Sequence, residues 1–372
     1  TAGATAPGGD IKRILLNRSD YYSMTGGHGA CRGCGEVTAI HLLNSLSHRI
    51  GDDRTAAHLR TLDDTLARLT VLLESLPHTS SRRARVTDTV AELERRLYLY
   101  ESGPTGNGPA STVIANSTGC SSVYASTMPF SPYLDPWVNG LFQDAQPLAV
   151  GIFEGLVSGL VGEVRALRLA RLLLDGSYDP SVHETALSTL SWRDFTAEER
   201  ALIPVVLTIS GDGAAFDIGF GALSRVLAGG TPIKSLVLDT GGYSNTGGQA
   251  STASHAGQDA DLARYGSAHA GKQESRKEIG LLASFHPGVY VCSVATAFHG
   301  HFLRASADLL GFNEGAALMI AYTPCDTENG MPEDQATARS RLAVESRVSP
   351  LFTHDPRRGT TVAQRFSLEG NP

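Results

Sequence analysis

The stretch VVLTISGDGAAFDIGFGALSRVL, residues 205–227, joins a strand pattern to a helix pattern through a turn. Residues 205–209 are mostly apolar and mostly β-branched, which favours a buried strand. Residues 211–213, Gly-Asp-Gly, are a turn signal, and residues 219–227 have helical spacing of apolar side chains. A strand that enters a helix through a glycine-rich turn aims free backbone N–H groups at a phosphate. The stretch therefore predicts a βα unit that can hold an anionic ligand.

Four further runs of β-branched and apolar residues predict strands at 112–115, 236–238, 289–294 and 318–322. A helical pattern at 302–310 lies between the last two of them. Strands that alternate with helices form sheets that are mostly parallel and covered on both faces. The predicted class is therefore α/β, with a mostly parallel sheet covered by helices on both faces.

Two mainly helical stretches interrupt this alternation. Leucines recur at three- and four-residue spacing from 59 to 76, and a second helical pattern runs from about 86 to 99. We expect a helical hairpin with a flexible loop as an insertion at 52–109, and a helical region at 151–200, within one domain covering 1–372. The hairpin's arginines could bind an acidic electron carrier. The more ordinary interpretation is that they form a solvated helix face. They are Arg82, Arg83, Arg85, Arg95 and Arg96.

Composition narrows the class of protein. The chain has 372 residues, 41% of them hydrophobic, which allows a sizeable core. Its net charge of −7 argues against nucleic-acid binding, because phosphate contacts need a basic face. Five cysteines without a leader pattern fit a reducing cytoplasm, and no membrane span is expected, because no apolar run approaches roughly 18 residues. The termini suggest a segment of a longer polypeptide, since the first residue is not Met.

Polar or sulfur-bearing residues follow four of the predicted strands. Residues 116–120 follow the first strand, 211–213 the second, 240–245 the third and 323–325 the last. Open α/β sheets bind ligands outside the carboxyl ends of their strands. We therefore expect the four segments to meet at one site.

Several of these residues offer oxygen ligands. The Asp212 carboxylate, the Thr240 hydroxyl and the Asn245 amide, with a carbonyl from the glycine-rich turn, suit a Mg²⁺ that also binds a diphosphate. An isolated Gly-Asp-Gly is as often an ordinary turn. The second polar cluster, one strand later, is what favours a binding site.

The cysteines form a second candidate site. Cys31-Arg32-Gly33-Cys34 has the spacing that lets two thiolates bind one metal centre, and Cys120 and Cys325 each follow a predicted strand. Spacing alone suits a 4Fe-4S cluster and a zinc ion equally. A redox dithiol at Cys31 and Cys34, or buried cysteines acting as small apolar residues, are further alternatives. Cys292 lies inside a strand pattern and is interpreted as a core residue.

The strings GDGAAFDIGFG at 211–221 and YSNTGGQ at 243–249 closely resemble the thiamine-diphosphate-binding region of the pyruvate:ferredoxin oxidoreductase family, a 2-oxoacid:ferredoxin oxidoreductase family. Three cysteine-bearing segments resemble those that bind the iron-sulfur cluster nearest the cofactor in that family, namely residues 29–36, 118–122 and 321–325. The similarity runs from about 22 to 355. The chain departs from the family at Ala214, where a Trp is usual.

The resemblance implies that thiamine diphosphate, Mg²⁺ and one 4Fe-4S cluster bind to this chain. The Mg²⁺ would be bound by Asp212, Thr240 and the Gly242 carbonyl. The cluster would be bound by Cys31, Cys34, Cys120 and Cys325. The residues implied to contact thiamine diphosphate are Glu36, Cys120, Gly211, Asp212, Gly213, Ala214, Thr240, Tyr243, Ser244 and Asn245. No catalytic residue is assigned, because the Glu that activates the aminopyrimidine is expected on a pyrimidine-binding domain elsewhere.

Some neighbouring residues keep an ordinary interpretation. A solvent-facing position at a helix N-terminus is the alternative for Glu36. Val123 either packs beneath the thiazolium or belongs to the core. His28 and His255 are interpreted as loop residues rather than as an acid or base.

By resemblance, the activity is CoA-dependent oxidative decarboxylation of a 2-oxoacid, pyruvate first, with ferredoxin or flavodoxin as electron acceptor. The implied assembly is a dimer that includes a pyrimidine-binding domain or subunit, and no nucleic-acid or membrane partner is expected. Two other classes stay open. One is a non-redox thiamine-diphosphate decarboxylase or synthase, and the other is a non-catalytic iron-sulfur electron-transfer subunit.

Overall fold

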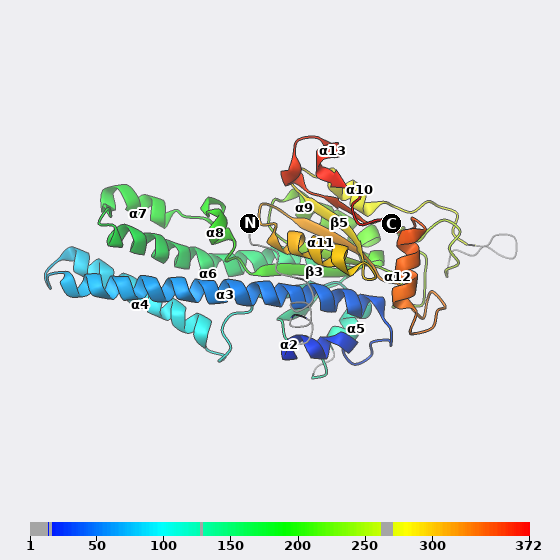
Figure 1. Cartoon of the computed structure of the whole chain (residues 1–372), viewed down its shortest axis with the longest axis horizontal. Helices are drawn as coiled ribbons and strands as arrows, with labels where there is room; N and C mark the ends of the chain where they lie inside the picture. Colours follow the sequence, from blue (N-terminus) through cyan, green and yellow to red (C-terminus); the bar gives the residue numbers. More distant parts are fainter. Residues whose placement is uncertain (1–13, 15–16, 127–128, 262–270) are drawn as a thin grey trace. The chain divides into compact units, whose positions relative to one another are not determined.

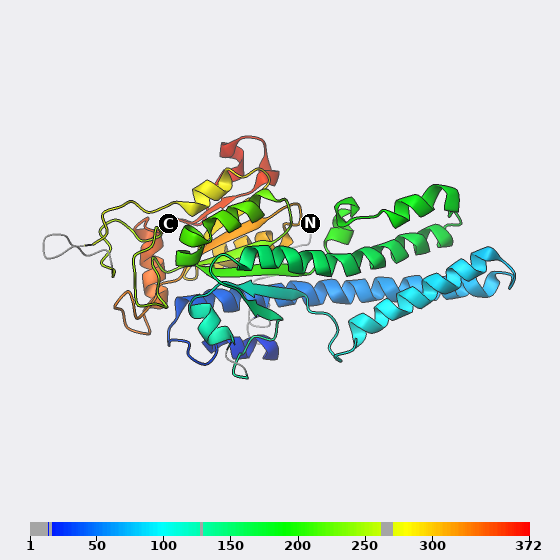
Figure 2. The ribbon, with the colours of Figure 1, turned by 180° about the vertical axis from the view of Figure 1, so that it is seen from behind.

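A computed structural model describes residue 14 and residues 17–126, 129–261 and 271–372 (Figures 1 and 2). The chain divides into two compact units. The first comprises Thr1–Arg49, Thr112–Gly151 and Val205–Pro372, and the second comprises Ile50–Ser111 and Ile152–Pro204.

The first unit is built on an eight-stranded sheet with the order β2-β1-β3-β4-β6-β5-β7-β8. Its strands are β1 (Thr112–Asn116), β2 (Trp137–Asn139), β3 (Val205–Gly211), β4 (Lys234–Asp239), β5 (Tyr290–Ala295), β6 (Ala317–Tyr322), β7 (Phe352–His354) and β8 (Phe366–Ser367). Strands β1 to β6 pair in parallel, whereas β7 and β8 are antiparallel additions at one edge. The five strands predicted from the sequence are confirmed. The other three, β2, β7 and β8, have two or three residues each, too few for a strand pattern.

Helices cover both faces of this sheet. The chain crosses the sheet in one direction from β3 to β4 and from β4 to β5, and returns from β5 to β6. Because such crossovers are right-handed, the helices of the two directions lie on opposite faces. Figures 1 and 2 show α9 (Phe220–Ala228) and α10 (Ile279–Ser284) on one face and α11 (His299–Gly311) on the other. The predicted α/β class is confirmed.

The remaining helices of the first unit are either short or contribute residues to both units. They are α2 (Arg18–Tyr21), η1 (Tyr22–Thr25), α5 (Cys120–Ser126), η3 (Gly213–Ile218), α12 (Ala336–Glu345), η5 (Pro356–Arg358) and α13 (Val362–Arg365). Two long helices, α3 (Gly35–Ser75) and α6 (Ala145–Leu174), contribute residues to both units. Helix α3 has no break at residue 52, where the sequence pattern placed the start of an insertion.

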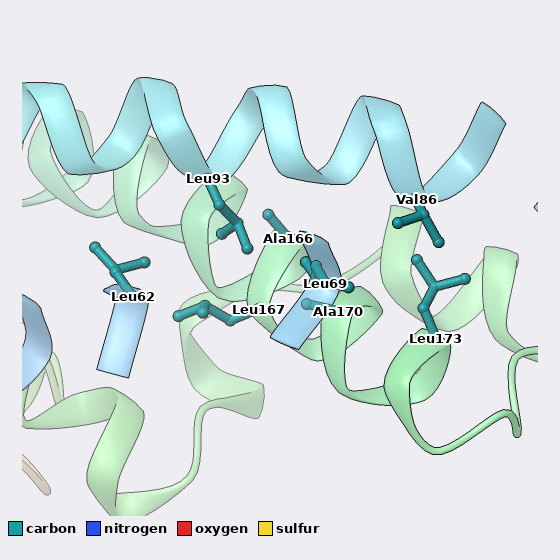
Figure 3. Close-up of a cluster of buried hydrophobic side chains, with 8 residues drawn as sticks. All are labelled: Leu62, Leu69, Val86, Leu93, Ala166, Leu167, Ala170 and Leu173. Atoms are coloured by element: carbon teal, nitrogen blue, oxygen red, sulfur yellow. The ribbon is translucent and has the colours of Figure 1, made fainter. Parts of the chain in front are cut away.

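The second unit contains the rest of α3 and α6 with α4 (Ser81–Glu101), α7 (Pro180–Ser188), η2 (Trp192–Asp194) and α8 (Ala197–Arg200). Its core joins three helices (Figure 3). The eight buried residues are Leu62, Leu69, Val86, Leu93, Ala166, Leu167, Ala170 and Leu173. Leucines at helical spacing put one apolar stripe of α3 into this core.

The hairpin arginines have partners within the second unit. Arg83 donates to the carbonyls of Leu73 and Leu76 at 2.5 and 2.8 Å, which satisfies the C-terminal end of α3. Arg85 pairs with Glu184 at 2.5 Å. Arg82 donates to a carbonyl of α6, and Arg95 and Arg96 pair with a glutamate of their own helix. These contacts favour a structural role over a free basic face.

One described helix, α6, is long and apolar enough to cross a membrane by length and composition. The sequence pattern did not single out this helix, because charged residues such as Glu154, Glu163 and Arg165 interrupt its apolar residues. In its most apolar 18-residue stretch, 33% of the helix is buried. A core helix of a soluble protein can have the same length and apolar composition. The helix is weak evidence for a membrane span.

A partly buried ion network anchors α3 within the first unit. His48 contacts Asp20 through Nδ1 at 2.6 Å and Asp135 through Nε2 at 2.8 Å. Burial lowers the pKa of His48, but the hydrogen bonds to Asp135 and Asp20 outweigh burial and raise it to about 10. His48 is therefore a partly buried cation shared by two carboxylates.

We expect Leu69→Ala to lower the free energy of unfolding by about 2–5 kcal/mol, because it leaves a cavity among three helices. Val71→Ala is the matched control on the same helix, since Val71 is 68% exposed. Chemical denaturation of both variants measures the difference. Equal effects of the two substitutions would contradict the described core.

We expect His48→Gln to lower the free energy of unfolding by roughly 3 kcal/mol at pH 6, because two buried carboxylates lose their cation. The raised folded-state pKa means that this contribution is complete below pH 6.5 and is lost as the pH rises through about 10. Urea unfolding at pH 6, 8 and 10 measures it, with the exposed His78→Gln as control. A difference that does not change with pH would refute the assignment.

Candidate functional site

The four polar segments follow four adjacent strands of the sheet. Strands β1, β3, β4 and β6 are neighbours in that order and run parallel. Their carboxyl ends therefore lie at one edge. The chain leaves β1 toward β2 on one side and leaves β3 toward β4 on the other, so a topological switch point lies between β1 and β3. Such a switch point opens a crevice for a ligand.

A cavity lies at this edge. All ten residues that the resemblance placed around thiamine diphosphate line it, from Glu36 to Asn245, as does Gly242. Thr118, Gly119 and Thr246 also line it; they lie in segments that the sequence singled out but were not assigned as cofactor contacts, and only Phe142 lies outside those segments. The position of Thr118 and Gly119 directly after β1 is the signal that had placed their segment at the site.

Three oxygens converge around the Thr240 hydroxyl. Thr240 Oγ1 lies 3.0 Å from Asp212 Oδ1 and 3.1 Å from the Gly242 carbonyl oxygen. Ser244 Oγ donates to Thr240 Oγ1 at 2.7 Å. An all-oxygen set of carboxylate, hydroxyl and carbonyl is the donor chemistry that Mg²⁺ prefers.

Asp212 is a buried carboxylate, with 1% of the residue exposed. It accepts hydrogen bonds from the Thr240 N–H at 3.1 Å and from Ser251 Oγ at 3.2 Å. Burial, and then the nearby carboxylate of Asp239, raise the pKa of Asp212 to about 8. A cation beside Asp212 would stabilise its charged form.

Asp239 has its own counter-ion. Arg276 Nη2 lies 2.5 Å from Asp239 Oδ2, and Arg276 also donates to the Ala253 carbonyl. The Gly241 N–H donates to Asp239 Oδ1 at 3.2 Å. Arg276 thus neutralises the second buried carboxylate and joins the end of β4 to the loop that carries Ser251. The sequence reasoning missed Arg276, which has no local motif.

The turn at Gly213 packs against an aromatic ring. A Cβ atom at Gly213 would lie 2.4 Å from Cδ1 of Tyr243, so a side chain there must displace the ring. The glycine therefore lets the Gly211–Gly213 turn and the loop after β4 approach closely.

Four cysteines line a second cavity of about 170 Å³. They are Cys31, Cys34, Cys120 and Cys325, all free thiols. Five lining residues belong to both cavities, so the two adjoin: Glu36, Cys120, Thr240, Ser244 and Asn245. Cys292 is buried within β5, as expected for a core residue.

Close backbone packing brings the cysteine segments together. Gly33 has φ +76°, and a Cβ there would lie 1.8 Å from the Glu333 carbonyl oxygen. A Cβ at Gly35 would lie 2.9 Å from the Pro324 carbonyl oxygen. The Cys31–Cys34 loop can approach the Cys325 segment this closely because both positions lack a side chain.

The thiols lie near enough to influence one another. Burial, and then Glu36, raise the pKa of Cys120, and the other three cysteines add to this effect. Burial raises the pKa of Cys34 and of Cys325 as well. Within the part of the chain that the structure describes, no group of three or more His, Cys, Asp or Glu side chains is arranged to hold a metal ion. The thiols share one cavity without forming a closed ligand set.

Glu36 lies at the start of α3 and is 5% exposed, so the solvent-facing alternative was wrong. Its Oε2 accepts a hydrogen bond from Tyr124 Oη at 3.2 Å. Burial raises the pKa of Glu36 to about 7, and the Tyr124 bond opposes this shift. Val123 is 45% exposed and lines the cysteine cavity, which excludes a core role. His28 and His255 line neither cavity.

No family model matches the chain. The pyruvate-flavodoxin oxidoreductase of Rhodospirillum rubrum is 32% identical over 292 residues, which cover 69% of this chain and 24% of that protein. The pyruvate:ferredoxin oxidoreductase of Moorella thermoacetica is 30% identical over 301 residues, covering 69% and 25%. The probable pyruvate-flavodoxin oxidoreductase of Escherichia coli is 30% identical over 332 residues, covering 78% and 27%.

Among solved structures, a 2-oxoglutarate:ferredoxin oxidoreductase from Magnetococcus marinus matches 62% of this chain and 60% of its own. Its TM-score of 0.41 and identity of 18% are too low to support any functional argument. The chain spans about a quarter of the length of the curated relatives described above. Over the region that matches them, this chain belongs to the pyruvate:ferredoxin (flavodoxin) oxidoreductase family.

Proposed function

We propose that this chain is the thiamine-diphosphate- and 4Fe-4S-binding part of a 2-oxoacid oxidoreductase. The whole enzyme would decarboxylate a 2-oxoacid, with pyruvate first among candidates, transfer the acyl group to CoA and reduce ferredoxin or flavodoxin. One observation carries this proposal. A cavity lined by the Gly211–Gly213 turn adjoins a cavity lined by four cysteines, and residues such as Cys120 line both.

The residues of the first cavity fit a magnesium diphosphate. Asp212, Thr240 and the Gly242 carbonyl would hold the Mg²⁺, since their oxygens already converge. The turn that starts at Gly211 would offer backbone N–H groups to the phosphates. When bound, thiamine diphosphate supplies the electron sink that decarboxylation of a 2-oxoacid requires.

The second cavity fits an iron-sulfur cluster by its donor chemistry. Four cysteines are the usual ligands of a 4Fe-4S cluster, and such ligands bind as thiolates. The raised pKa values of Cys34, Cys120 and Cys325 show that their neutral forms are favoured as the protein stands. A positively charged metal centre would reverse this preference. Because Cys120 lines both cavities, a cluster bound through it would lie beside the cofactor.

The rest of the enzyme must complete the site. The relatives are about four times longer than the region that they share with this chain. We propose that the aminopyrimidine-activating Glu lies on a pyrimidine-binding domain, either in the same polypeptide or in a separate subunit of a dimeric cytoplasmic enzyme. This chain alone is then expected to be inactive. Full 2-oxoacid-dependent reduction of an acceptor by the isolated chain would contradict this division.

We expect Asp212→Asn to weaken binding of thiamine diphosphate at saturating Mg²⁺ by at least about 100-fold, because it removes the charged metal ligand and keeps its shape. Titration calorimetry on the full-length protein measures the affinity. Asp334→Asn, at an exposed site of the first unit, is the matched control. Unchanged affinity in Asp212→Asn would refute the Mg²⁺ assignment and favour an electron-transfer subunit without thiamine diphosphate.

We expect Cys120→Ser to remove most of the reducible 4Fe-4S signal from anaerobically purified full-length protein, because one of four thiolate ligands is lost. Cys292→Ala is the control and should keep the signal, since Cys292 lies in the strand core. Iron and sulfide analysis with EPR spectroscopy measures both variants against the wild type. The quantity compared is the loss of one cluster equivalent per chain. Wild-type protein that lacks this cluster would favour a non-redox thiamine-diphosphate enzyme.

A further inference from the structure

The cofactor cavity has two walls that come from different strands. One wall is the turn after β3, at residues 211–214, and the other is the loop after β4, at residues 240–246. Tyr243 joins them. Its ring lies against Gly213, and its hydroxyl donates to Asp217 Oδ2 at 2.7 Å.

Asp217 is itself held in place. It belongs to η3, the π-helical turn that follows the Gly211–Gly213 turn, and its φ of −105° and ψ of −106° depart from helical values. Its carboxylate accepts from the Thr252 hydroxyl at 2.5 Å and from the Thr252 N–H at 3.3 Å. The carbonyl of the preceding residue, Phe216, accepts from the Thr252 hydroxyl and from Lys277 Nζ. Departures of this kind inside a helix concentrate at functional sites.

The position of Tyr243 fixes the residues that follow it. The Tyr243 N–H donates to the Gln249 carbonyl at 2.9 Å, and the Gly248 N–H donates back to the Tyr243 carbonyl at 3.0 Å. These two bonds close the loop that carries Ser244, Asn245 and Thr246 into the cavity. A shift of the Tyr243 ring therefore moves this wall relative to the turn at Gly213.

We propose that Asp217 is a positioning residue for the thiamine-diphosphate site and acts through Tyr243. The hydrogen bond between them holds the ring on Gly213 and sets the spacing of the two walls. The inference rests on the proposed function, because it concerns affinity for that cofactor. In this proposal the Tyr243 hydroxyl donates to Asp217 and so sets the distance between the two walls, rather than binding a diphosphate.

The test is a double-mutant cycle on the full-length protein. The dissociation constant of thiamine diphosphate at saturating Mg²⁺ is measured by calorimetry for Tyr243→Phe, Asp217→Ala and the double variant. We expect each single variant to bind about tenfold more weakly, which corresponds to about 1.4 kcal/mol. The double variant should be no weaker than Asp217→Ala alone, because both changes remove the same bond.

Two further variants separate positioning from general stability. Asp217→Asn keeps an acceptor for the Tyr243 hydroxyl and should recover most of the lost affinity. Tyr178→Phe is the matched control, since its hydroxyl also donates to a carboxylate, Glu184, at 2.6 Å, but in the second unit. It should bind thiamine diphosphate as the wild type does. Thermal unfolding of each apoprotein shows whether an affinity loss merely follows lost stability.

The outcomes are distinct. Wild-type affinity in Tyr243→Phe, or losses that multiply in the double variant, would overturn the positioning role and leave the proposed function intact. Affinity losses that track the melting temperature, with no recovery in Asp217→Asn, would reduce Asp217 to a structural residue and also overturn the proposal. Wild-type protein that does not bind thiamine diphosphate would overturn this inference and the proposed function together.

Discussion

Parallel pairing of four neighbouring strands is the constraint on which the site depends. The register sets Asn116 beside Ile209, Gly211 beside Leu238, and Asp239 beside Tyr322. The strands β1, β3, β4 and β6 therefore end within about three residues of one another along the strand direction. Because the loops that follow these strands begin at nearly the same height along the sheet edge, segments far apart in the sequence can contact one another through short loops. The two adjoining cavities follow from this edge.

Burial of polar groups at this edge is costly unless they are paired. Asp239 is neutralised by Arg276, whereas Asp212 accepts hydrogen bonds and forms no salt bridge among the described residues. The partly buried thiols of Cys34, Cys120 and Cys325 are likewise disfavoured as thiolates. A bound metal would stabilise the charged forms of both groups, namely the Asp212 carboxylate and the cysteine thiolates.

Much of the sheet could be predicted from the sequence because its strands are continuous apolar runs, as at 205–209 and 318–322. Most candidate residues could be predicted for a related reason, because they follow such a run. Cys31, Cys34 and Glu36 do not follow a strand and were found from the spacing of the two cysteines and from the resemblance. What could not be predicted depends on contacts between distant segments. Arg276 reaches Asp239 across 37 residues, and Asp217 reaches Tyr243 across 26. The short strands β2, β7 and β8 form only because a neighbouring strand is present.

The central claim is that an electron sink and an iron-sulfur cluster share one site at this edge. It is tested most directly by EPR spectroscopy of the full-length protein, purified anaerobically and mixed with pyruvate, with and without thiamine diphosphate and Mg²⁺. The account predicts a reduced 4Fe-4S signal that develops only when the cofactor and metal are present. A signal that develops equally without thiamine diphosphate, or protein that binds the cofactor but contains no iron, would contradict it.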